Sequence, residues 1–127
     1  MNESANTAAT MSIDLKKFRI RIYKASLHLL GDPKFIQVLV NPDEMIVAVR
    51  AVEQELAGDQ TYRVNQHQLH SDNSVEIYSR FFIKRLCSLV DGLDAGYSYR
   101  LSGIVAPAEK MLVYSLKTIK RIDGREV

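Results

Sequence analysis

Cysteine is nearly missing from this 127-residue sequence, which contains only Cys87. One cysteine cannot form an internal disulfide, and such low usage is typical of a reducing compartment. The sequence also has no apolar run of the roughly 18 residues that cross a bilayer as a helix. Its first twelve residues lack the basic start and apolar core of a signal peptide. We therefore predict a cytoplasmic protein with no membrane partner.

Neither positive nor negative charge dominates the composition. Seventeen Lys and Arg stand against 15 Asp and Glu, which gives a formal net charge of +2 at pH 7. Nucleic-acid-binding domains usually concentrate their basic residues in a patch or stripe, so net charge alone leaves nucleic-acid binding open. Hydrophobic residues make up 46% of the chain, which is enough to bury the core of a single domain.

Motifs for catalysis and for cofactors are missing too. The sequence has no phosphate-binding loop and no dinucleotide glycine motif. The run His70-Ser71-Asp72 has the residue types of a hydrolytic triad, but adjacent residues do not generally converge as a triad does. His67 and His70 lack the further ligands that a zinc site needs, and Cys87 fits the core side of an apolar helix. We predict a protein that is not an enzyme and holds no metal or cofactor.

The sequence does contain a repeated arrangement: the same succession of strand and helix patterns occurs twice along the chain. Alternating apolar and polar residues predict a strand, helical spacing follows, and two further strands flank a proline-containing turn. The expected elements of the first copy are strand 18–23, helix 26–30 and strands 35–40 and 45–52. Those of the second copy are strand 75–78, helix 81–90 and strands 97–105 and 111–119.

These patterns predict an α+β fold in which two tandem βαββ copies form one compact barrel or sandwich. One βαββ unit cannot bury both faces of its hairpin, so two units must close a common core. Ile20-Arg21-Ile22-Tyr23 and Val75-Glu76-Ile77-Tyr78, which lie 55 positions apart, support the duplication. The expected boundaries are a flexible arm at 1–12, a domain at 13–119 (copy one 18–52, linker 53–73, copy two 74–119) and a polar tail at 120–127. Within the linker, the one expected element is a short strand at 61–64.

Residues 18–31 carry a strand-into-helix pattern formed by Arg19, Ile20, Ile22, Lys24, Leu30 and Gly31. The pattern resembles the signature Gly-Arg-Ile-x-Ile-Pro-Lys-x-x-Arg-x-x-Leu-Gly of the swapped-hairpin family of bacterial transcription regulators. The chain departs from it where Phe18, Tyr23 and Leu27 replace the Gly, the Pro and the second Arg. Ser74 and Ser79 replace the basic residues in copy two. The resemblance implies a DNA-binding regulator, and such units also form homo-oligomers.

The candidate binding residues are Lys17, Arg19, Arg21 and Lys24. By the period-two rule the first three share one face of a strand, where their charges form a positive stripe. Such a stripe suits the phosphates of double-stranded DNA, and Arg also reads guanine edges. A solvated strand face protected by charge explains these residues more simply. Our working hypothesis is a DNA-binding transcriptional regulator.

A second class of function fits the sequence as well. A non-enzymatic protein-interaction or assembly module, such as a phage or mobile-element accessory protein, would act through sheet edges or the helix that bears Phe81 and Phe82. An exposed apolar patch would favour this class, and a continuous positive face would favour DNA. Tyr97, Tyr99 and Tyr114 suit base stacking on a sheet face, although core packing explains them more simply.

Overall fold

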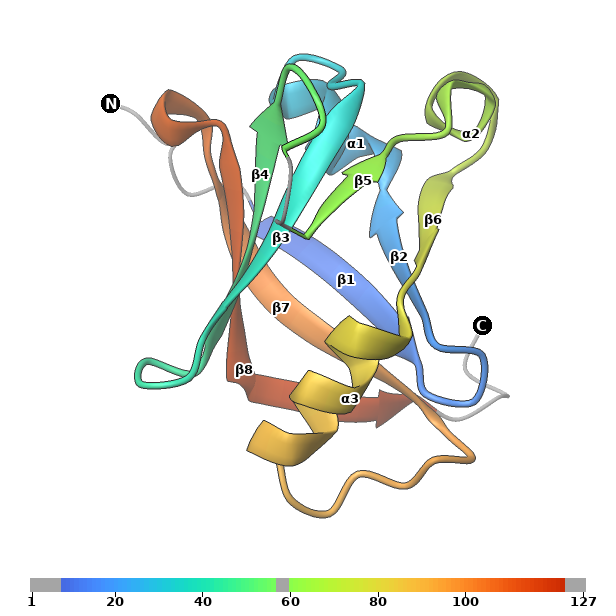
Figure 1. The fold of residues 1–127 in the computed structure, drawn as a ribbon, viewed down its shortest axis with the longest axis vertical. Helices are drawn as coiled ribbons and strands as arrows, with labels where there is room; N and C mark the ends of the chain where they lie inside the picture. The colour runs from blue at the N-terminus through green and yellow to red at the C-terminus, as the bar shows by residue number, and fades with distance from the viewer. Residues whose placement is uncertain (1–7, 57–59, 123–127) are drawn as a thin grey trace.

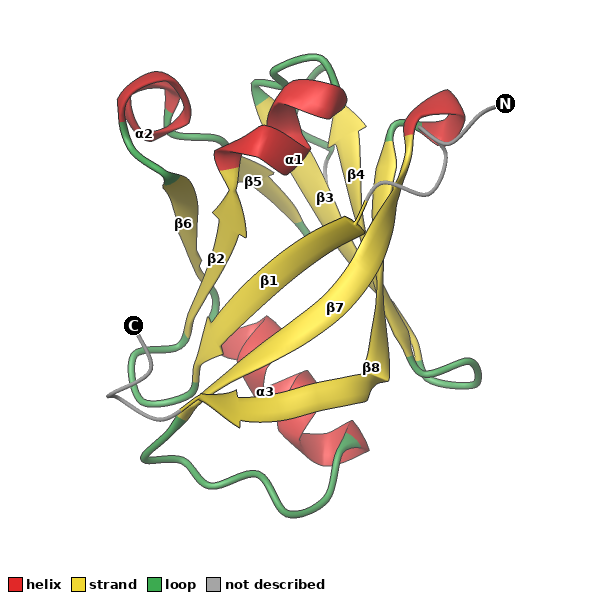
Figure 2. Ribbon diagram, turned by 180° about the vertical axis from the view of Figure 1, so that it is seen from behind, coloured by secondary structure: helices red, strands yellow, loops and turns green. Residues whose placement is uncertain are grey.

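The structure, a computed structural model, describes residues 8–56 and 60–122. The fold is α+β: within these residues eight strands form one antiparallel sheet that curls into a nearly closed barrel (Figures 1 and 2). The strands follow the order β5-β3-β4-β8-β7-β1-β2-β6, so β5 and β6 are the two edges. Their bounds are β1 Ala8–Asp14, β2 Arg19–Tyr23, β3 Phe35–Asn41, β4 Ile46–Val52, β5 Thr61–Arg63, β6 Ser74–Tyr78, β7 Ser98–Ala106 and β8 Met111–Ile122.

Short helices lie at the two ends of the barrel. They are α1 (Lys24–Leu29), α2 (Gln66–Ser71), α3 (Arg80–Leu89) and the 3-10 turn η2 (Pro107–Glu109). In Figure 1, α3 lies across the lower part of the barrel, and α1 and α2 lie near its upper end. Ser79 starts α3, because its Oγ accepts a hydrogen bond from the backbone N–H of Phe82 at 3.1 Å. This N-cap satisfies one of the donors that a helix start leaves free.

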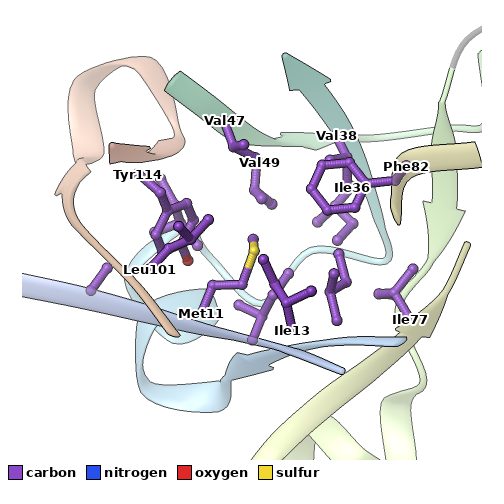
Figure 3. Packing of buried hydrophobic residues seen from close by; sticks show 14 of the residues in the cluster. Met11, Ile13, Ile36, Val38, Val47, Val49, Ile77, Phe82, Leu101 and Tyr114 are labelled. Atoms are coloured by element: carbon purple, nitrogen blue, oxygen red, sulfur yellow. The ribbon is translucent and has the colours of Figure 1, made fainter. Parts of the chain in front are cut away.

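Alternation along the strands builds the core. Successive strand side chains point to opposite faces, so every second residue faces the barrel interior. Figure 3 shows inward side chains of facing strands meeting one another and Phe82 of α3. The fully buried members include Met11, Ile13, Ile36, Val47, Val49, Leu101 and Tyr114. Burying each such side chain stabilises the fold by about 1.5–3 kcal/mol relative to an exposed one.

Two long-range pairings close the sheet around this core. The hairpin β3–β4 joins the hairpin β7–β8 through the β4–β8 ladder, in which Ala48 stands opposite Val113. Strand β2 joins β6, with Arg21 opposite Glu76. Strands β1 and β7 complete the circuit between these two ladders. The predicted order of strand, helix and hairpin is present in both segments.

The predicted arm at 1–12 is too long, because residues 8–12 belong to β1. Ala9, Met11 and Ile13 alternate with polar residues, and all three are buried in the core. Small and polar neighbours hide this strand in the sequence, and it forms by pairing with β2 on one side and β7 on the other. Residues 1–7 lie outside the described part of the chain.

The predicted linker at 53–73 contains β5, which matches the short strand expected at 61–64, and also α2, which was not predicted. Val64 and Leu69 anchor it in the core, and Asn65 caps α2 by accepting a hydrogen bond from Gln68 N–H at 3.0 Å. The predicted polar tail is also too long at its start, since β8 continues through residues 120–122; residues 123–127 are not described. None of the described helices has both the length and the apolar character needed to span a membrane.

Candidate nucleic-acid interface

One part of the barrel's outer surface gathers most of the charge on the sheet. It lies over β1, β2 and β6 and over the adjoining ends of β7 and β8, and we call it the arginine face. Its side chains alternate with buried ones and therefore point outward. The members of the arginine face are Ser12, Asp14, Arg19, Arg21, Tyr23, Glu76, Tyr78, Ser98, Arg100 and Lys120.

Cross-strand pairing places the cations of this face in one row. Residues directly opposite each other in antiparallel strands hold their Cβ atoms about 5 Å apart. Moving from β8 to β6, the opposed residues are Lys120, Arg100, Ser12, Arg21 and Glu76. Three cations therefore line up across the strands, with a serine between two of them and a carboxylate at the end.

The same face is hollowed. Arg19, Arg21 and Arg100 line a depression of about 370 Å³ together with Ser12, Asp14 and Tyr23 among others. A second depression, of about 390 Å³, runs from Thr10 toward the start of α1. Tyr23 and Arg100 line both, so the two depressions adjoin along β1. The arrangement is a shallow groove with guanidinium groups in its walls.

Two of the arginines already have acidic partners. Arg19 contacts Asp14 at 3.1 Å between Nη2 and Oδ2, and Arg21 contacts Glu76 at 2.8 Å between Nη2 and Oε2. Arg19 also lies 3.5 Å from the same Glu76 oxygen. The hydrogen bond from Arg21 lowers the pKa of Glu76 below its usual value, so the carboxylate stays charged near neutral pH. These pairs are partly exposed, and such pairs stabilise a protein only weakly.

Arg100 and Lys120 differ from the paired arginines. Both side chains are exposed, and among residues 8–56 and 60–122 neither has an ion-pair partner. They stand directly opposite each other on β7 and β8. Both charges are therefore open to an anion without first breaking an ion pair, that of Arg100 in the wall of the groove and that of Lys120 beside it in the row.

The four predicted site residues divide into two groups. Arg19 and Arg21 share one strand face, as their spacing predicts. Lys17 does not share it, because β2 begins only at Arg19 and the left-handed φ of 55° at Phe18 breaks the alternation. Lys24 is half-buried at the start of α1, beyond the end of β2, and its backbone N–H donates to the Asn73 carbonyl at 3.0 Å.

Sequence reasoning missed Arg100 and Lys120. Arg100 lies between outward Ser98 and Ser102 on a strand with inward Tyr99 and Leu101, and this local alternation marks it as exposed. No local sequence pattern shows that β7 lies beside β1, so the sequence does not predict that Arg100 lies near Arg21. Tyr99 and Tyr114, at 6% and 0% exposed, are core residues.

Comparison with protein-family models, with characterised proteins and with solved structures finds no match to this chain. The likeness of residues 18–31 to the swapped-hairpin signature stays a prediction. One detail suits it: Phe18 stands at the glycine position of the signature, and its φ lies in the left-handed region that glycine adopts most easily. Within the described residues, no group of three or more His, Cys, Asp or Glu is placed to hold a metal ion.

Proposed function

We propose that this chain is a non-enzymatic DNA-binding regulator that contacts DNA through the arginine face. The observation that carries the proposal is the cross-strand row of Lys120, Arg100 and Arg21, of which the two arginines line the groove. Lys and Arg side chains that neutralise phosphates release bound counterions, and this supplies much of the affinity for nucleic acid. Arg19 lies in the same groove and adds a further contact once its carboxylate partners are displaced.

We also propose that segments 18–52 and 74–119 are tandem copies in a swapped-hairpin arrangement. Their first strands pair as β2–β6 and their last strands pair as β4–β8. The pair at the centre of the first ladder, Arg21 and Glu76, is 55 positions apart, which is the offset of the two similar sequence runs. Each hairpin lies between strands from outside its own segment: β3–β4 between β5 and β8, and β7–β8 between β4 and β1.

Fluorescence anisotropy of labelled double-stranded DNA, titrated at two salt concentrations, tests the binding. The decisive variant is Arg100→Glu/Lys120→Glu, and its matched control is Lys34→Glu/Lys84→Glu, which makes the same charge change at exposed residues off the face. We expect the first variant to lose at least about tenfold in affinity and to flatten the salt dependence by roughly one unit of slope per lost contact. Equal losses in the two variants would leave only a general effect of net charge.

A second candidate function is that of a protein-interaction or assembly module, which would bind its partner through a different outer surface. Over β3, β4, the first half of β8 and the second half of β7, one cross-strand row is entirely apolar: Leu39, Ala48, Val113 and Ile104. We call this row and its neighbours the apolar face. Leu39 and Ile104 remain 38% and 44% exposed. Self-association measured by light scattering, and its loss in Leu39→Glu/Ile104→Glu, would support this function.

A further inference from the structure

We infer that the arginine face binds a single strand of nucleic acid, with bases stacked on Tyr78 and Tyr23. The inference rests on the proposed function and names the form of ligand that the groove takes. Proteins that bind single strands combine a basic groove along the backbone with aromatic rings on which bases stack. Both parts are present on this face.

Tyr78 is the more open of the two rings. It is 59% exposed at the end of β6, and its hydroxyl donates to Glu76 Oε1 at 3.3 Å. Its neighbour across the β2–β6 ladder is Arg19. An aromatic ring left in solvent beside a guanidinium group provides a flat apolar surface next to a phosphate contact, which is the combination that a stacked nucleotide needs.

Tyr23 provides the second ring. It ends β2 opposite Ser74, lines both depressions of the groove, and its hydroxyl lies 3.5 Å from Ser12 Oγ. The pairs Arg19–Tyr78 and Tyr23–Ser74 are four residues apart along the ladder. At about 3.3 Å per residue the two tyrosines therefore stand roughly 13 Å apart along the strands.

Between the two rings lies the charged centre of the face. Arg19 lies beside Tyr78 in the ladder, and Arg21, opposite Glu76, occupies the next outward position of β2, midway to Tyr23. Aromatic and basic side chains thus follow one another along a single direction of the sheet. A chain of nucleotides that runs in this direction meets the ring of Tyr78 with Arg19 beside it, then Arg21 with its Glu76 partner, and then the ring of Tyr23.

The shape of the face favours a single strand over a duplex. Direct reading of duplex DNA requires a helix or a two-stranded ribbon that enters the major groove, which is about 12 Å wide. Here Arg19, Arg21 and Arg100 line a depression in a sheet, and no helix of eight or more residues within the described chain presents them. A flexible strand follows a concave surface and exposes its bases to the tyrosines, whereas paired bases are already stacked on one another.

The test compares one oligonucleotide as a single strand and as a duplex of the same length, by anisotropy at low salt. We expect the single strand to bind at least about tenfold more tightly than the duplex, and Tyr78→Ala or Tyr23→Ala to weaken single-strand binding about 5- to 100-fold. The variants Tyr78→Phe and Tyr23→Phe keep the ring and should bind as the wild type does. Tyr97→Ala is the matched control, because Tyr97 is 40% exposed but is not a member of the arginine face, and Arg121 lies over its ring.

The outcomes separate this inference from the function on which it rests. Tighter binding of the duplex, or single-strand binding that survives both alanine variants, overturns the stacking inference and leaves the arginine face as a DNA-binding surface. No binding of either form by the wild type overturns the proposed function itself. Thermal melting of each variant confirms that a lost affinity is not lost folding.

Discussion

The arginine face and the apolar face belong to one sheet and cover one core, yet their outward side chains differ sharply. The arginine face carries four cations and two carboxylates. On β3 and β4, beside the apolar row, the single charged outward residue is Arg50. Its Nη2 donates a hydrogen bond to Gln37 at 2.6 Å. The inward residues of both regions are uniformly apolar.

The buried core therefore does not determine which side chains the outer surface of the sheet carries. Inward positions must be apolar in both regions, because they meet in the same interior. Outward positions of an antiparallel sheet are usually polar, and the arginine face follows this rule. The apolar face departs from it without any described segment covering Leu39 or Ile104. The two surfaces are therefore suited to different partners, a polyanion on one and a protein on the other.

The largest expected effect comes from the strand that the two faces share. Strand β7 presents Arg100 on the arginine face and Ile104 on the apolar face, and Leu101 between them is fully buried. Leu101→Ala should lower the free energy of unfolding by about 2–5 kcal/mol and weaken both faces together, because it leaves a cavity in their common core. Urea unfolding measures the loss. Ile104→Ala is the control, with a change within about 0.5 kcal/mol; an equal loss in both would mean that Leu101 is not a core residue.

The next test concerns the two edges of the sheet, β5 and β6. The hydroxyl of Tyr62 in β5 and that of Ser79, the residue after β6, form a hydrogen bond at 2.8 Å, and Ser79 also caps α3. Ser79→Ala removes both contacts and should destabilise the fold by about 1–2 kcal/mol. Ser88→Ala, at an exposed position near the other end of α3, should cost much less. Hydrogen exchange should show faster opening of β5 and β6 than of β7 in the Ser79 variant.

A buried hydroxyl beneath the apolar face gives a pH-dependent prediction. Tyr114 is fully buried, its hydroxyl has no hydrogen-bond partner among the described residues, and burial raises the pKa of Tyr114 well above its ordinary value of 10.0. Above pH 10 the unfolded chain therefore loses this proton while the folded chain keeps it, so stability falls with a slope approaching roughly 1.4 kcal/mol per pH unit.

Tyr114→Phe should remove this part of the alkaline loss. It should also raise the free energy of unfolding by about 1 kcal/mol at neutral pH, because an unsatisfied polar group leaves the core. Urea unfolding at neutral and alkaline pH measures both effects. A variant that is less stable than the wild type at neutral pH would show that the hydroxyl has a partner.

The fold was readable from the sequence wherever a pattern is local. Alternation located β2 and β6, and turn residues located the hairpin around Pro42. Strand β1 was not predicted, because its outward residues are small or polar and its pairing with β7, far along the chain, leaves no local pattern. In the supposed linker the short strand β5 was expected, whereas the single buried Leu69 was too isolated to predict α2.

The candidate site was readable to the same extent. Arg19 and Arg21 share a face because they lie two positions apart on one strand. Their contact with Glu76 depends on the register of the β2–β6 ladder, and the grouping with Arg100 depends on the β1–β7 ladder. Registers between distant strands are set by the closed core as a whole, so no local pattern reveals them.

The smallest expected effect concerns the carboxylate that contacts two arginines of the arginine face. Glu76 holds Arg21 and Arg19, so a phosphate must displace this carboxylate to reach them. Glu76→Gln should raise DNA affinity about 3- to 10-fold and steepen its salt dependence, because the two guanidinium groups become free for phosphate contacts. Glu44→Gln makes the same charge change in the exposed turn between β3 and β4, beside the apolar face, and should leave affinity nearly unchanged.

Acid titration checks the same contact without a ligand. The pKa of Glu76 is lowered in the folded protein, mainly by Arg21, so its contribution to stability is present above its ordinary pKa of 4.5 and is lost as the pH falls through the lowered value. The Glu76→Gln variant should lack this part of the acid loss, whereas Glu44→Gln should retain it. If Glu76→Gln and Glu44→Gln raised DNA affinity equally, only net charge would be at work, and the carboxylate would not compete with DNA for the arginines.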